Sequence, residues 1–167
     1  MEQQRLVHRV LAKAFEEEGL SYRKAGLAII YLQDRVWRRM VQPREYTKPL
    51  EYLTDALEAS DRGSEESFAT LLSHADTITL DVGLFPEQYR RDAAYRRFLT
   101  TAAKAIYQRG RATNPLAEQT YDQLVTHYDH GLSVLHRFRT RFTELERAED
   151  KVAVAKADLE RARWQLN

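Results

Sequence analysis

Cysteine is absent from this chain of 167 residues. Its absence excludes disulfide bonds, thiolate metal sites and a cysteine nucleophile. Long apolar runs are also missing: the longest covers residues 25–32, whereas a membrane span needs roughly 18 or more apolar residues. The first residues lack the basic patch and the apolar core of a signal peptide. We therefore expect a soluble, cytoplasmic protein that makes no membrane contact.

Glycine and proline are scarce, with 6 and 4 residues. Between them, apolar residues recur at intervals of three and four, which is the α-helical period. No stretch rich in β-branched and aromatic residues alternates apolar with polar positions, which argues against strands. Apolar residues make up 43% of the chain and charged residues 31%, the balance of a globular domain. We predict an all-α fold: a helical bundle of about six to seven helices with a long C-terminal helix.

The first two helices are predicted over residues 3–18 and 21–41, separated by Gly19 in a left-handed turn. The inner face of the first is expected to hold Val7, Val10, Leu11, Ala14 and Phe15. The inner face of the second is expected to hold Ala25, Ala28, Ile29, Leu32, Val36 and Met40. A connector between Pro43 and Pro49 and a short helix over residues 50–59 follow.

The remaining helix-breaking residues, mainly glycine and proline, divide the second half of the chain. Ser64 is predicted to cap a helix over residues 65–82. The run from Gly83 to Pro86 is predicted to break the chain, and the helix that Pro86 starts is expected to end at Gly110. From Asn114-Pro115 onward we expect one long helix or two helices stacked end to end.

A series of motifs lies in a fixed order within residues 68–142. The motifs are Phe68 with Leu71-Leu72, Gly83-Leu84-Phe85-Pro86-Glu87, Tyr95, Ala102-Ala103 with Ala105-Ile106-Tyr107, Tyr121-Asp122-Gln123-Leu124 and Val134-Leu135. They resemble a family of uncharacterised all-helical bacterial proteins, whose core has a Gly-Phe-Phe-Pro-Glu turn, a tyrosine-rich helix and a final helix with spaced leucines. The resemblance covers under half of the chain and implies the fold alone, because no activity or ligand is known for the family. The chain departs from the family in its many arginines.

Positive charge is concentrated in residues 86–111. Seven cations stand against two anions there, a net charge of +5. Four of the cations, spaced seven apart, lie opposite the apolar side of the predicted helix and are named here the basic stripe: Arg90, Arg97, Lys104 and Arg111. One interpretation is a binding surface for the phosphates of a nucleic acid or for an acidic partner.

A second interpretation of the basic stripe is compensation within the chain. Residues 55–81 carry seven acidic residues and one arginine, a net charge of −6. Helices adjacent in sequence usually pack together, so these carboxylates could meet the stripe. The net charge of the whole chain, only +1, favours this interpretation, because dedicated nucleic-acid domains are usually strongly basic.

Histidines are the candidate metal ligands. His127 and His130 lie three residues apart on one predicted helix face, His136 lies farther along, and His74 near Asp76 could add ligands. The chain has no Glu-x-x-His pair of the kind that carboxylate-bridged two-metal bundles use. We therefore favour histidines that lie on the surface or pack partly, and we predict no metal and no cofactor.

Motifs of the common catalytic classes are missing as well. The chain contains no Gly-x-Ser-x-Gly, no phosphate-binding glycine loop and no Gly-x-Gly-x-x-Gly. Its nine tyrosines suit helical cores, with the hydroxyl at the rim. We predict that the protein is not an enzyme and has no catalytic residue.

A coiled-coil heptad pattern occupies residues 143–167, after a predicted bundle core over residues 1–142. Leucine or valine alternates with alanine along a line named here the heptad seam: Leu145, Ala148, Val152, Ala155, Leu159, Ala162 and Leu166. The seam belongs to the same domain and packs onto that core, or it is a dimerisation arm that pairs with another copy. The pattern leaves both alternatives open.

Charges beside the heptad seam distinguish two orientations of a homodimer. A parallel pair would bring Glu144 to Glu149 and Lys151 to Lys156, so two of its three flanking pairs would be repulsive. An antiparallel pair would bring Glu149 to Lys156 and Lys151 to Asp158, each twice, and would set a large residue against an alanine throughout. The pattern favours the antiparallel pair.

We predict a non-enzymatic helical interaction protein, an adaptor or regulator with a protein partner and a C-terminal dimerisation arm. One alternative is nucleic-acid or phosphate binding through the basic stripe. Another is a metal-binding helical protein that uses the histidines.

Overall fold

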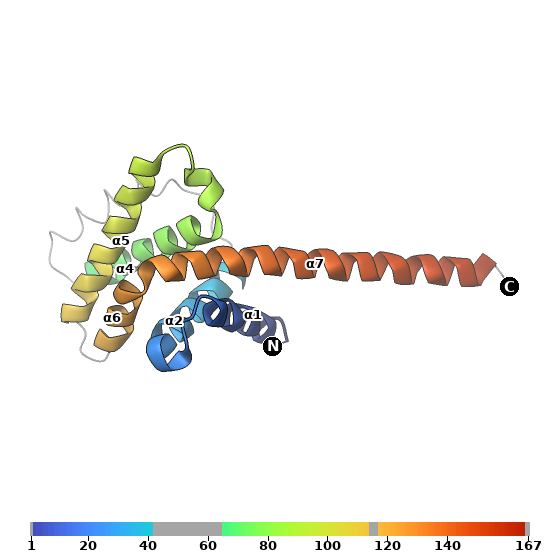
Figure 1. Ribbon diagram of the computed structural model, residues 1–167, viewed down its shortest axis with the longest axis horizontal. Helices are drawn as coiled ribbons and strands as arrows, with labels where there is room; N and C mark the ends of the chain where they lie inside the picture. The colour runs from blue at the N-terminus through green and yellow to red at the C-terminus, as the bar shows by residue number, and fades with distance from the viewer. Residues whose placement is uncertain (1, 42–64, 114–116, 166–167) are drawn as a thin grey trace.

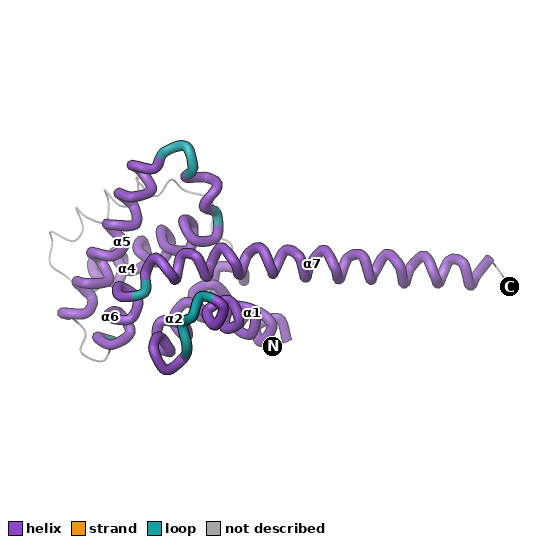
Figure 2. Tube along the Cα trace, viewed as in Figure 1, coloured by secondary structure: helices purple, strands orange, loops and turns teal. Residues whose placement is uncertain are grey.

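The computed structural model describes residues 2–41, 65–113 and 117–165, with the side chains of 65–67, 112–113 and 159–165 left aside. These ranges contain helices and no strand, which confirms the predicted all-α fold (Figure 2). The helices are α1 (Glu2–Glu17), α2 (Tyr22–Val41), α4 (Glu65–Leu84), the short 3-10 helix η1 (Pro86–Tyr89), α5 (Ala93–Thr113), α6 (Glu118–Thr126) and α7 (Tyr128–Gln165). The predicted connector between Pro43 and Pro49, the helix over 50–59, the Ser64 cap and the Asn114-Pro115 restart lie outside the described residues.

The first part of α7 runs through the middle of the bundle (Figure 1). Helices α1 and α2 pack together on one side of it, and α4 and α5 pack together on the other. Helix α6 lies against α5 and α2. Helix α4 is buried on almost every side from Ala75 to Leu84, because it packs against both α5 and α7.

Periodicity identified the inner faces of α1 and α2 almost completely. All five residues predicted for α1 are buried, as are five of the six predicted for α2. Met40 is the exception, with 40% of its surface exposed, and the neighbouring Val41 is 54% exposed. The last turn of α2 extends past the core that covers the rest of its apolar face.

The predicted left-handed stop between the first two helices is confirmed. Gly19 has a φ of 75°, which a residue with a side chain adopts only with strain. The N–H of Leu20 donates to the carbonyl of Phe15, and the N–H of Gly19 donates to that of Glu16. This is a Schellman arrangement, and the buried Leu20 supplies the apolar contact that accompanies it.

Two other glycines were wrongly predicted to end helices. Gly83 lies inside α4 and Gly110 inside α5. A Cβ on Gly110 would stand 2.9 Å from Phe68 Cζ and 3.0 Å from Tyr121 Cε2. A Cβ on Gly83 would stand even closer, 2.6 Å from Leu135 Cδ1 of α7. Both glycines therefore serve close approach between helices rather than chain reversal.

The predicted single helix over residues 86–110 is also wrong. Pro86 starts only the four residues of η1, and α5 begins separately at Ala93. Asp92 Oδ1 accepts a hydrogen bond of 2.8 Å from the N–H of Tyr95, in the manner of an N-cap residue. The cap lets the chain start a new helix in a new direction.

The described C-terminal region forms two helices rather than one, but α6 and α7 meet at an angle and are not stacked end to end (Figure 1). The break falls at His127, whose φ of −108° and ψ of 21° are not helical. Gly131 lies four residues later, within the first turns of α7.

A kink divides α2 near its start, at Ala25 (φ −138°, ψ 23°). The kink interrupts the helical hydrogen bonding, so backbone N–H groups just after it donate to the side chain of Gln123 of α6. Its Oε1 accepts from the N–H groups of Leu27 at 2.9 Å and Ala28 at 3.2 Å. Gln123 thus caps the main part of α2 from another helix.

Candidate functional site

The C-terminal part of α7 leaves the bundle and extends away from it (Figure 1). Residues 143–165 of the helix are named here the α7 arm. Before the arm, Leu132, Leu135 and Phe138 are buried, and Phe142 packs partly against the core. From Glu144 to Lys156 every residue is exposed. At 1.5 Å per residue, the arm is about 35 Å long.

The described half of the heptad seam is uncovered. Leu145 is 41% and Val152 54% exposed, and Ala148 and Ala155 are exposed as well. Docking of this half onto the chain's own bundle is therefore excluded. The side chains of Leu159 and Ala162, and all of Leu166, lie outside the described residues.

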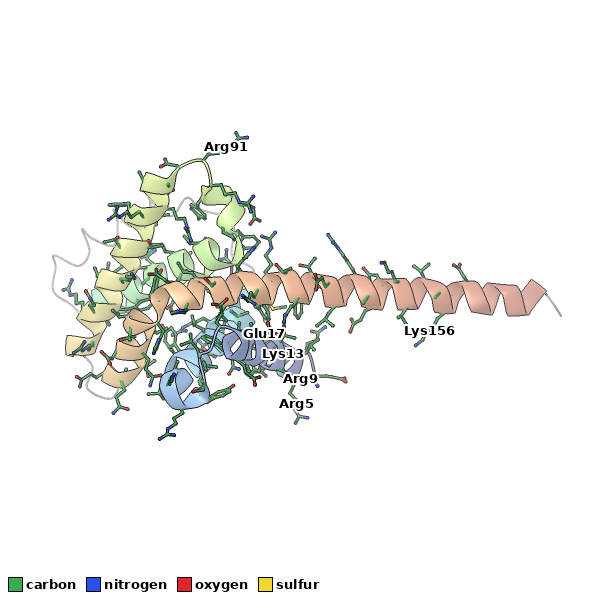
Figure 3. All side chains as sticks on the ribbon, viewed as in Figure 1. Arg5, Arg9, Lys13, Glu17, Arg91 and Lys156 are labelled. Carbon is green, nitrogen blue, oxygen red and sulfur yellow. The ribbon has the colours of Figure 1, made fainter. Side chains whose placement is uncertain are left out.

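A groove follows the seam on one side of the arm. Its lining combines the apolar Leu145, Ala148, Val152 and Ala153 with the charged Glu149 and Lys156. Lys156 projects from the arm well clear of the bundle (Figure 3). An apolar line with charged borders is the arrangement that a second helix recognises in a coiled coil.

The base of the arm is held by ion pairs to α1. Arg137 pairs with Glu17 and Glu18, and Arg141 pairs with Glu17. These residues are partly exposed, so each pair contributes little to stability alone. They orient the helix where its apolar packing ends.

Arg139, in the same segment, fixes the corner between α4 and η1. Its Nη1 donates to the carbonyl of Leu84 at 2.9 Å and pairs with Glu87. The hydrogen bond from Arg139 to the Glu87 carboxylate lowers the pKa of that carboxyl. The guanidinium also covers the Phe85 ring, with Cζ 4.5 Å from its centroid.

The basic stripe is divided between paired and unpaired residues. Arg111 pairs with Asp122 of α6 at 2.9 Å. Lys104 lies 3.7 Å from Asp129 of α7 and 5.5 Å from the centre of the Tyr128 ring. Arg90 and Arg97 are exposed, and no ion pair to either is found in the part of the chain that the structure describes.

Two carboxylates of α4, Asp76 and Asp81, pair with α2, so the interpretation that they meet the basic stripe is wrong for these two residues. Asp81 lies 2.9 Å from Arg39, and Asp76 lies 3.0 Å from Arg35 Nε. Burial raises the pKa of Asp81, and the charge of Arg39 opposes that rise. The acidic residues at 55–61 lie outside the described residues.

Asp76 is also the centre of a buried polar cluster that sequence reasoning missed. Its Oδ1 accepts hydrogen bonds from the hydroxyls of Tyr31 at 2.7 Å and Tyr107 at 2.8 Å. Thr79, one turn farther along α4, lies within hydrogen-bond distance of the hydroxyls of Tyr107 and Tyr128. The cluster joins α2, α4, α5 and α7. The tyrosine-rich pattern was the only sequence signal for it.

The three phenols of this cluster act as hydrogen-bond donors in the core. Burial and the charge of Asp76 raise the pKa values of Tyr31 and Tyr107, and burial also raises that of Tyr128. Phenols with raised pKa values stay protonated near neutral pH, so they donate hydrogen bonds and do not act as bases.

A hollow of about 350 Å³ opens beside the cluster, between α2 and α4. Three arginines border it, and each already faces a carboxylate: Arg35 with Asp76, Arg38 with Asp34 and Arg39 with Asp81. An incoming anion would therefore compete with existing pairs, which makes the hollow a weak anion site.

The four histidines considered as metal ligands are exposed or half-buried, as predicted. His127 lies at the break between α6 and α7: its N–H donates to the carbonyl of Gln123, and its carbonyl accepts from the N–H of Gly131. His130 and His136 are exposed on α7, and His74 is half-buried on α4. Within the ranges described, no three or more histidine, aspartate or glutamate residues come close enough to hold a metal ion.

Comparison with protein-family models, curated proteins and solved structures found no match to this chain. The resemblance to an uncharacterised bacterial family therefore stays a prediction. No helix in the described part of the chain combines the length and apolar character needed to cross a bilayer.

Proposed function

We propose that the protein is a non-enzymatic helical interaction protein that binds a protein partner through the α7 arm. The exposed apolar line from Leu145 to Ala155 supports this proposal. An amphipathic helix gains most of its stability from burial of its apolar face. Between Glu144 and Lys156, the described part of the chain gives the arm no such burial. A continuous apolar line on an otherwise charged projection marks an interaction surface.

Two valines on the arm provide a matched test. Val152 lies on the heptad seam, and Val154 lies off it, with 54% and 61% of their surfaces exposed. We expect Val152→Glu to abolish association through the arm, because it places a carboxylate on the seam. Val154→Glu introduces the same charge on the outer face and should leave association intact.

The readouts are molecular mass against concentration by analytical ultracentrifugation, and co-purification of other proteins with each variant as bait. At a concentration where wild type is monomeric, thermal melts of both variants should match wild type, because both valines are exposed on the arm. If neither readout distinguishes Val152→Glu from Val154→Glu, the arm is not an interaction surface.

A second candidate function is phosphate binding through the unpaired part of the basic stripe. Arg90 and Arg97 support it, and Arg91 beside them points outward at the corner before α5 (Figure 3). Arg97→Glu should weaken binding of a labelled single-stranded RNA about tenfold, and binding by wild type should fall steeply with salt. Arg9→Glu on α1 makes the same charge change elsewhere on the surface and is the control. Equal effects of the two variants would exclude a site at the stripe.

A further inference from the structure

We infer that the partner of the α7 arm is the same arm of a second copy, paired antiparallel about a centre between Ala153 and Val154. The inference rests on the proposed function and names its partner. Charge distribution, packing along the seam and the length of the arm each support it.

Charge is distributed unevenly along the arm. Residues 144–150 carry four acidic residues and one arginine, a net charge of −3. Residues 151–163 carry four basic and two acidic residues, a net charge of +2. A parallel pair would place like halves together, whereas an antiparallel pair places each acidic half beside a basic half. Opposed helix dipoles favour the same orientation.

Single charged residues beside the groove also favour the antiparallel orientation. In the antiparallel register, Glu149 of one copy faces Lys156 of the other, and the twofold symmetry makes this contact twice. Both side chains line the groove and are exposed. A parallel pair would instead place Lys151 beside Lys156.

The antiparallel register also brings large and small residues of the heptad seam together, and the overlap that it requires matches the length of the arm. Val152 faces Ala155, so a larger side chain meets a small one at the centre, and the two helices can approach closely. Residue 165, the last of α7, then lies beside residue 142 of the other copy. Burial in the bundle ends at that point, since Phe142 is partly buried and Glu144 is exposed. The two arms then overlap along their whole length, and each ends where the burial of the other copy's α7 begins.

A charge exchange in the full-length protein tests the orientation. Lys156→Glu converts two attractive contacts into two repulsive ones, so we expect it to weaken dimerisation about tenfold. Glu149→Lys combined with Lys156→Glu restores opposite charges and should return the dissociation constant to within about threefold of wild type. In a parallel pair, Lys156→Glu would face Lys151 and strengthen the dimer, which would overturn the inference.

Distance measurement provides an independent test, because the chain has no cysteine and single labels are clean. Arg147→Cys and Arg161→Cys introduce labels two heptads apart on α7. In the antiparallel pair, a 147 label lies beside a 161 label of the other copy, whereas two 147 labels are offset by about 20 Å along the axis. We expect short-linker crosslinking only in the mixed sample. Strong crosslinking within the 147 sample and none in the mixture would show a parallel pair.

The outcomes separate this inference from the proposed function. A chain that stays monomeric at high micromolar concentration, yet captures another protein with Val154→Glu and not with Val152→Glu, overturns self-pairing and keeps the arm as an interaction surface. If the chain stays monomeric and no captured protein binds Val154→Glu better than Val152→Glu, both the self-pairing and the proposed function are overturned.

Discussion

Gly83 of α4 lies directly against Leu135 of α7. A Cβ on Gly83 would stand 2.6 Å from Leu135 Cδ1 and 2.8 Å from Leu135 Cβ. The missing side chain lets the buried helix α4 touch the central helix, and both residues are buried. The contact explains why a glycine lies inside a helix, where it is normally unfavourable.

Gly83→Ala should therefore destabilise the protein by about 1–3 kcal/mol, because the added methyl overpacks the α4–α7 contact. Gly26→Ala is the matched control. Gly26 also lies in a helix, but a Cβ there meets nothing closer than 3.7 Å, so alanine should stabilise by about 0.5–1 kcal/mol. Chemical denaturation measures both. Equal changes in the free energy of unfolding for the two variants would contradict the close approach of α4 and α7 at Gly83.

Asp76→Asn should cost about 3 kcal/mol or more, because it leaves Arg35 and the tyrosine hydroxyls around Asp76 without their buried charge partner. Asp122→Asn provides the comparison. Asp122 pairs with Arg111 at a site where both side chains are 52% exposed, so its loss should cost less than about 1 kcal/mol. Urea unfolding followed by circular dichroism would show the difference. A small cost for Asp76→Asn would mean that the cluster does not hold the helices together.

The tyrosine cluster predicts a loss of stability in alkali. Burial raises the pKa values of Tyr31, Tyr107 and Tyr128 above the ordinary 10.0, so their phenols stay protonated in the folded chain. Their contribution to stability is complete below pH 10 and is lost as the pH rises above it, because the unfolded chain releases those protons first. Tyrosinate absorbance of these residues should appear together with loss of the helical signal. In the double variant Tyr31→Phe with Tyr107→Phe, the free energy of unfolding should fall less steeply with rising pH. An equally steep fall would show that these tyrosines do not cause the loss of stability in alkali.

Phe85 and Arg139 should be energetically coupled. Phe85 is only half-buried, with Arg139 over its ring. Phe85→Ala should thus cost about 1–2 kcal/mol, less than the roughly 3 kcal/mol of an enclosed ring. A double-mutant cycle with Arg139→Gln should yield a coupling of about 0.5–1 kcal/mol. Additive effects would show that the stacked geometry contributes nothing.

Several features followed from the sequence alone. Apolar spacing placed the helices and the buried faces of α1 and α2, because helical periodicity is a local property of the chain. Gly19 was identified as a left-handed stop because it follows one complete amphipathic pattern and precedes another. The heptad seam was likewise visible as a pattern, together with the charges that border it.

Only the tertiary structure decided how those parts are used. The sequence could not separate a stop such as Gly19 from a packing glycine such as Gly83, because the difference lies in Leu135, a residue on another helix. It could not pair Asp76 with Arg35 rather than with the basic stripe, since that choice depends on which helices α4 touches. For the same reason, the exposure of Val152 was undetermined until the bundle was seen to end at Phe142. Contacts between residues distant in the chain arise from packing, which local periodicity does not encode.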